Sequence, residues 1–245
     1  MPQNNDRSLM YPLSLRLAGR LIAVEGIDGS GKSTQAQLLA QWLRDKGYIV
    51  HETSWNSSPL IKRDLRRAKR RTSLTPRTFS LMHAADLAER LEREILCPLR
   101  AGQLVLADRW VYTALTRDVA RGMDPKWLRA LYAMAPRPHL TVYFRVPVEV
   151  ALRRIAIGRS EIRYYEAGMD LGLASTPQES FLLFQRRVVE HYEQLVQTDG
   201  LEVIDAVEPV AVQQKRLRAM ADRVLHKKRI ASPRVVEVVT GSHAR

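Results

Sequence analysis

Gly26-Ile-Asp-Gly-Ser-Gly-Lys-Ser33 follows the short apolar run Arg20–Glu25 and precedes a segment whose apolar residues recur at helical spacing. The eight residues match the pattern G-x-x-x-x-G-K-[S/T]. Glycines let backbone N–H groups close around phosphate oxygens, and the helix that follows adds the positive end of its dipole. The pattern assigns nucleotide phosphates to Lys32 and a Mg²⁺ ion to the hydroxyl of Ser33. The stretch therefore predicts a nucleotide-binding loop between a strand and a helix.

The rest of the chain alternates between short apolar runs and helical patterns. The further runs with the length of buried strands are 48–52, 104–107, 139–146 and 201–205. The segments with helical spacing are 33 to about 47, 77–100, the residues after Pro147, those after Thr176, and 209–225. This alternation predicts an α/β fold in which a five-stranded parallel sheet carries helices on both faces. Ligands of such sheets bind beyond the carboxyl ends of the strands.

Length and composition narrow the class of protein. A chain of 245 residues fits one large α/β domain or two small ones. Its single cysteine, Cys97, excludes an intramolecular disulfide and so disfavours a disulfide-stapled secreted scaffold. No apolar run reaches the roughly 18 residues of a membrane helix. We therefore expect a cytoplasmic protein with one domain over 20–227, an N-terminal extension at 1–19 and a basic tail at 228–245.

Positive charge is concentrated in two places. The chain has 39 Lys and Arg against 26 Asp and Glu, a formal net charge of +13. Basic residues crowd into 62–71 and again into 215–229. We interpret both clusters as solvated helix faces and a basic tail. Aromatic residues do not interleave with the first cluster, so we do not expect nucleic acid as a partner.

A second carboxylate bears on what happens to the nucleotide. Asp108 ends the apolar run 104–107, a usual place for a residue of the Mg²⁺ shell. The next residue is Arg109, not a glutamate that could activate water. A cation at this position is suited to gripping a second phosphate, which favours transfer to a phosphorylated acceptor over hydrolysis. The sequence also lacks the guanine-reading motif N-K-x-D, which disfavours a GTPase.

The stretch from Glu25 to Thr34, followed by Asp108-Arg109-Trp110, resembles the thymidylate (dTMP) kinases, a family of P-loop nucleoside monophosphate kinases. The likeness runs from about residue 20 to 206. The resemblance implies a three-layer P-loop kinase fold with a lid segment at about 156–177. It implies transfer of the γ-phosphoryl group of ATP to dTMP for dTTP biosynthesis, with Mg²⁺, nucleotides as small-molecule partners, and a homodimer. Such transfer depends on the positioning of the two nucleotides and on neutralisation of the charge on their phosphate oxygens.

The resemblance also implies roles for particular residues. Asp28 would approach the acceptor sugar or the metal, and Arg109 and Arg63 would hold the acceptor phosphate. The residues expected to contact ATP are Gly26, Ile27, Asp28, Gly29, Ser30, Gly31, Lys32, Ser33 and Thr34. Those expected at the acceptor are Asp28, Arg63, His83, Arg109 and Glu166, and those at the metal are Ser33 and Asp108. The expected catalytic residues are Lys32, Asp28, Asp108, Arg109 and the lid arginines Arg159 and Arg163.

Three departures from the family pattern concern the acceptor. His83 stands where the family stacks its thymine on an aromatic ring, and Leu87 stands where an arginine donates to the base. Arg117 replaces the tyrosine that helps to exclude a 2′-hydroxyl. Buried polar contacts of this kind control substrate choice strongly. The alternatives are therefore a P-loop kinase for another small acceptor, such as a different pyrimidine nucleotide, or a nucleotide-regulated nucleic-acid-binding protein.

Overall fold

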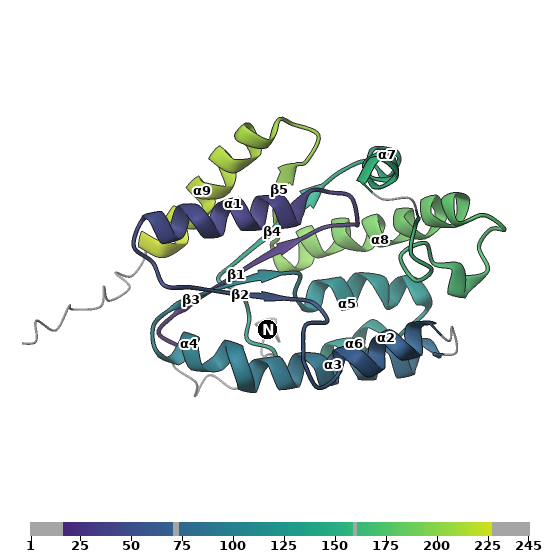
Figure 1. Cartoon of the computed structure of the whole chain (residues 1–245), viewed down its shortest axis with the longest axis horizontal. Helices are drawn as coiled ribbons and strands as arrows, with labels where there is room; N and C mark the ends of the chain where they lie inside the picture. Colours follow the sequence, from purple (N-terminus) through teal and green to yellow (C-terminus); the bar gives the residue numbers. More distant parts are fainter. Residues whose placement is uncertain (1–16, 71–73, 159–160, 227–245) are drawn as a thin grey trace, which may run out of the picture.

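The computed structural model describes residues 17–70, 74–158 and 161–226, and its centre is a parallel sheet of five strands (Figure 1). The strand that precedes the phosphate loop, β1 (Arg20–Glu25), lies in the middle. Its neighbours are β3 (Leu104–Asp108) and β4 (Leu140–Arg145), and the edges are β2 (Val50–Ser54) and β5 (Glu202–Asp205). The predicted α/β class and parallel sheet are confirmed.

Helices cover both faces of this sheet (Figure 1). On one face lie α1 (Lys32–Asp45) and α9 (Val210–His226). On the other lie α3 (Pro76–Arg90), α4 (Leu96–Arg100), α5 (Val111–Arg117) and α8 (Pro177–Asp199). Apart from a π-helical turn after α3, the remaining described helices are α2 (Lys62–Arg70), α6 (Pro125–Leu131), α7 (Val148–Gly158) and the short turns η2 (Val119–Arg121) and η3 (Met169–Leu171). None of the helices within the described ranges is long and apolar enough to cross a membrane.

Local chemistry explains where the well-predicted helices begin. Gly31 adopts a left-handed conformation (φ 84°) that turns the chain into α1. Thr176 caps α8 by accepting a hydrogen bond from the backbone N–H of Glu179 at 3.3 Å, and it donates to the Glu179 carboxylate at 2.8 Å. Gly200, also left-handed, ends that helix.

The long helix predicted over 77–100 is interrupted. A π-helical turn, η1 (Leu91–Ile95), separates α3 from α4. Pro98 lacks an N–H group, so a regular ladder of i to i−4 hydrogen bonds cannot run through it. The wider turn accompanies a contact with the sheet, because Thr53 of β2 donates to the carboxylate of Glu94 at 2.6 Å. This hydrogen bond connects the π-helical turn to the edge strand β2.

One helix was predicted only as a solvated basic face, and two were not predicted from the sequence. In α2 only Leu65 of the apolar side chains is deeply buried, so the basic stretch carries no apolar period. The helices α5 and α6 have seven residues each, too few for a periodic pattern to stand out. Of the three, α5 brings side chains to the phosphate loop, because Thr113 accepts from Arg109 and Arg117 donates to Asp28.

Candidate functional site

The phosphate loop, residues 26–33, joins β1 to α1 and has the backbone conformation that its glycines allow. Gly29 has a φ of 79°, and a Cβ atom on it would lie 2.4 Å from the carbonyl oxygen of Ala151 in α7. No side chain fits there unless α7 moves. An arginine inside the loop is therefore excluded by packing, and cations at this site must come from other elements.

Lys32 is the first residue of α1 and is only 6% exposed. Its ammonium donates to the carbonyl of Ile27 at 3.5 Å. Burial, together with the charge of Arg109, lowers the pKa of Lys32 to about 8, although Asp28 and Asp108 oppose the change. The ammonium is thus short of negative partners, a deficit that nucleotide phosphates would relieve. Ser33 and Thr34 follow it, exposed, at the start of the helix.

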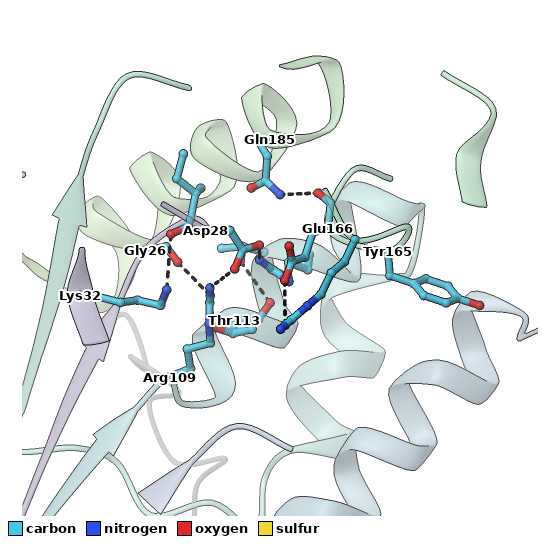
Figure 2. A network of polar contacts seen from close by, with 12 residues as sticks. Gly26, Asp28, Lys32, Arg109, Thr113, Tyr165, Glu166 and Gln185 are labelled. Carbon is cyan, nitrogen blue, oxygen red and sulfur yellow. Dashed lines mark hydrogen bonds and ion pairs between the residues drawn. The ribbon is translucent and has the colours of Figure 1, made fainter. Parts of the chain in front are cut away.

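The carboxylate of Asp28 forms ion pairs with two arginines, one of which is Arg109 (Figure 2). Arg109 donates to one carboxylate oxygen at 2.6 Å, and Arg117 donates to the other. All three side chains are at least four-fifths buried. Burial by itself would raise the pKa of Asp28, but the charges of Arg117, Arg109 and Lys32 outweigh it and hold that pKa well below its usual range. The carboxylate is therefore ionised and fixes both guanidinium groups at the mouth of the loop.

The backbone around Arg109 is held in an unusual conformation. Arg109 has a φ of 74°, which an L-residue other than glycine rarely adopts. This turn directs its guanidinium back to the carbonyl of Gly26, at 2.8 Å. The buried carboxylate of Glu25 stabilises the turn, since it accepts the backbone N–H of Trp110 at 2.7 Å and that of Thr113 at 3.2 Å. Glu25 therefore couples the end of β1 to the start of α5.

The residues expected at a metal lie at the same end of the sheet. Asp108 ends β3, and its Oδ1 atom is buried without a hydrogen-bond partner among the described residues. The hydroxyl of Ser33 is exposed beside Lys32. The described chain holds no cluster of three or more His, Cys, Asp or Glu side chains that would form a closed metal cage. Because Mg²⁺ prefers one or two protein oxygens, several waters and substrate phosphates, this sparse donor set fits Mg²⁺.

A hollow of about 330 Å³ opens beside the phosphate loop. It is lined by Asp28, Gly29, Lys32, Ser33, Arg154, Ile155, Gly158, Arg163 and Glu166. Arg163 pairs with Glu166 at 3.2 Å, and its side chain is 77% exposed at the rim of the hollow. Arg159 lies outside the described residues. Arg154, which we did not predict, joins the lining from α7 while it donates to the carbonyl of Ala206 at 2.9 Å.

Arg63 does not lie with these residues. Its side chain is 90% exposed, and it lines a separate hollow of about 540 Å³ on the outer side of α2, with Pro59, Lys62, Arg66 and Arg67.

Lys69 of the same helix faces inward, and its ammonium lies 5.0 Å from the ring centroid of Phe79. Burial, followed by the charges of Arg117 and Arg121, lowers the pKa of Lys69 to about 8. Its spacing of four residues from buried Leu65 was the available signal for this orientation.

His83 belongs to a cluster of aromatic rings. Its ring lies edge-on to Phe79 at 4.2 Å and to Trp55 at 5.5 Å. It is 5% exposed, and neither ring nitrogen has a hydrogen-bond partner within the part of the chain that the structure describes. Burial and then the charge of Lys69 hold the pKa of His83 well below its usual range, so the imidazole is neutral. Leu87, one turn further along α3, is fully buried in the core.

Comparison with known proteins identifies one family and several relatives of this chain. Residues 24–217 match the family model described as thymidylate kinase. The chain is 45% identical over 185 residues to a probable thymidylate kinase 2 of Saccharolobus solfataricus, covering 75% of this chain and 86% of that protein. It is 40% identical over 147 residues to a probable thymidylate kinase of Pyrococcus horikoshii, covering 58% and 72%. A probable thymidylate kinase of Pyrobaculum calidifontis is 31% identical over 204 residues, covering 83% and 96%.

Proposed function

The chain belongs to the thymidylate kinase family, and from this premise we propose that it transfers the γ-phosphoryl group of ATP to dTMP, giving dTDP and ADP. The observation that carries the proposal is the concentration of cations at the phosphate loop. Lys32, Arg109 and Arg117 lie around the carboxylate of Asp28. Arg154 and Arg163 line the same hollow, so the cations outnumber the carboxylates of Asp28, Asp108 and Glu166. This excess of positive charge makes a site for anions, and two nucleotide phosphates meeting there would restore the balance.

On the donor side, the loop backbone and Lys32 bind the phosphates of ATP. Ser33 and Asp108 are the residues that would hold Mg²⁺, whose charge, when it is bound, neutralises the oxygens of the transferred group. The unpartnered, buried oxygen of Asp108 supports this assignment. Arg163, beside the same hollow, provides a cation for the bridging phosphate, and we propose the same role for Arg159.

On the acceptor side, Arg109 and Arg117 present planar forks of N–H donors, which suit a phosphate monoester. Asp28 holds both forks in place before the substrate arrives, so little reorganisation is needed when the phosphate binds. An oxygen of the acceptor phosphate forms the new bond to the γ-phosphorus while the bond from that phosphorus to ADP breaks. The step requires no general base, because the attacking oxygen is already ionised.

The base of the acceptor is assigned to the aromatic cluster of Trp55, Phe79, His83 and Tyr165. A neutral His83 offers one N–H donor and one lone pair, which fits an uncharged pyrimidine edge. Lys69, above the ring of Phe79, lies between this cluster and the arginines, and we propose it as a further acceptor-phosphate ligand in place of Arg63.

The test is ADP release from Mg²⁺–ATP with dTMP, dUMP, UMP, CMP, AMP or thymidine as acceptor, and with none. We expect dTMP to give the highest kcat/KM and thymidine to give none, since it lacks the phosphate that the arginines hold. Lys32→Ala is the matched inactive control. A preference for another monophosphate would retain the kinase and refute dTMP, whereas ADP release that ignores the acceptor would refute the proposal.

We extend the proposal to the organisation of the protein. The protein has one catalytic domain over 20–227 and forms a homodimer. It is located in the cytoplasm, where its nucleotide substrates are found. Light scattering coupled to gel filtration tests the dimer: a mass near twice 28.0 kDa is expected, and a mass near 28.0 kDa would refute it.

A further inference from the structure

The segment 162–171, here called the strap, connects the phosphate loop to the aromatic cluster. Two adjacent residues of the strap face different ways (Figure 2). Glu166 lines the hollow beside Asp28 and Lys32. The ring of Tyr165 stacks on that of Phe79 in α3, with centroids 5.0 Å apart and planes 23° from parallel. A shift of the strap backbone would therefore disturb both halves of the site together.

One buried arginine holds this backbone. Arg121 ends η2, and its side chain is 2% exposed. Its Nε donates to the carboxylate of Asp170 at 2.8 Å, and its Nη2 donates to the carbonyl of Tyr165 at 2.7 Å. The guanidinium also lies 4.5 Å from the ring centroid of Phe184 and 5.4 Å from that of Phe79. Arg121 thus binds the strap at Tyr165 and Asp170 and packs against α3 and α8.

The long helix α8 supports the same backbone from its own side. Ser180 donates to the carbonyl of Ala167 at 2.8 Å, and Gln185 donates to the carbonyl of Glu166 at 2.7 Å. Gly168 has a φ of 67°, and a Cβ there would lie 2.5 Å from the ring of Phe184. These contacts, together with those of Arg121, act on four carbonyl or carboxylate groups within six residues. The strap is therefore held at defined points, not merely laid over the surface.

We propose that Arg121 is a positioning residue for phosphoryl transfer. By holding the Tyr165 carbonyl and Asp170, it keeps Glu166, and with it Arg163, beside the phosphate loop, and it keeps Tyr165 on Phe79. The planar fork of arginine serves two acceptors in fixed directions, which the single ammonium of lysine cannot reproduce. The catalytic part of this inference rests on the proposed function; the anchoring of the strap does not.

The test compares Arg121→Lys, which keeps the charge, with Asp170→Asn, which leaves Arg121 in place. Arg129→Lys is the matched control, because Arg129 binds Asp199 through two hydrogen bonds of 3.0 and 2.8 Å away from the strap. Hydrogen exchange of peptides covering 162–171 measures local opening, with α9 as internal reference because it packs on α1 and the sheet. Steady-state kinetics with ATP and dTMP measure kcat and KM on the same samples.

For Arg121→Lys we expect exchange in the strap to be about tenfold faster and kcat/KM for both substrates about tenfold lower, as for loss of one charge-assisted hydrogen bond. Asp170→Asn should change both in the same direction and by less, and Arg129→Lys should change neither. Unchanged strap exchange in Arg121→Lys would overturn the anchor, and faster exchange with normal kinetics would overturn its catalytic role. If Arg121→Lys does not fold, Asp170→Asn decides by the same criteria. A wild-type protein without kinase activity would refute the proposed function, while the exchange data would still test the anchor.

Discussion

Replacement of Glu25 by alanine should destabilise the fold and disable Arg109 together. The Glu25 carboxylate is completely buried and accepts four hydrogen bonds. Two come from the backbone N–H groups of Trp110 and Thr113, and two from the hydroxyls of Thr113 and Tyr192, at 2.7 and 2.8 Å. Alanine removes the shared acceptor and leaves all four donors in a closed space.

The expected magnitude follows from those donors. A buried donor left without a partner costs about 1–3 kcal/mol. The hydroxyl of Thr113 can turn to another acceptor, so three donors are lost in full. Burial raises the pKa of Glu25, which means that the buried carboxylate itself costs free energy. Removing the carboxylate therefore offsets part of the destabilisation caused by the unpaired donors. We expect the free energy of unfolding to fall by about 3–5 kcal/mol.

Glu25→Gln is the matched control for this experiment. The amide oxygen of glutamine can accept both backbone N–H groups, and its NH₂ group can donate to the hydroxyls of Thr113 and Tyr192, which also act as acceptors. We expect a loss of about 1 kcal/mol for this variant. Urea unfolding, monitored by tryptophan fluorescence, measures the free energy of unfolding of both variants. If Glu25→Ala and Glu25→Gln lost the same small amount, the reasoning that Glu25 anchors the Arg109 turn would be refuted.

Three further predictions use the charges of the site. Because the pKa of Lys32 is about 8 in the free protein, the affinity for Mg²⁺–ATP measured without dTMP should fall above pH 8; an affinity that is unchanged up to about pH 9.5 would contradict this. Burial raises the pKa of Asp118 to about 6, so this group stabilises the fold fully below its unfolded value of 3.8, and that contribution is lost as pH rises to 6. Asp118→Asn should therefore gain about 1–3 kcal/mol at pH 7.5 and nothing at pH 4, as urea unfolding at both pH values will show. Arg109→Ala should raise KM for dTMP at least tenfold more than KM for ATP, and equal rises would remove Arg109 from the acceptor side.

The phosphate loop and the strands were predictable because their signals are local. Predicted and observed bounds coincide for β1, and those of the other strands differ by one or two residues at one or both ends. A glycine pattern specifies backbone that encloses phosphate, whatever surrounds it. Burial on both faces of a parallel sheet produces short apolar runs that are visible without tertiary information. Lys32, Ser33 and Asp108 could be proposed as site residues for the same reason, since each sits at a fixed offset from such a run.

The acceptor side could not be assigned in the same way, because tertiary packing creates it. Arg117 and Asp28 are 89 positions apart in the chain, yet they form an ion pair. Arg63 and Lys69 belong to the same basic run, and only the burial of Leu65 decides which of them faces inward. The anchor at Arg121 depends on strap residues 44 and 49 positions away, Tyr165 and Asp170. Charge in the sequence indicated a phosphate site, but tertiary packing decides which cations lie together: Arg109 and Arg117 pair with Asp28, whereas Arg63 is exposed elsewhere.

Transfer of label from [γ-³²P]ATP to dTMP tests the central claim most directly. The account predicts that label leaves ATP only when the monophosphate is present and appears in dTDP in a one-to-one ratio with ADP, and that Lys32→Ala abolishes this transfer. Label recovered as inorganic phosphate, at a rate that dTMP does not change, would contradict the claim that the cations around Asp28 bring two nucleotides together.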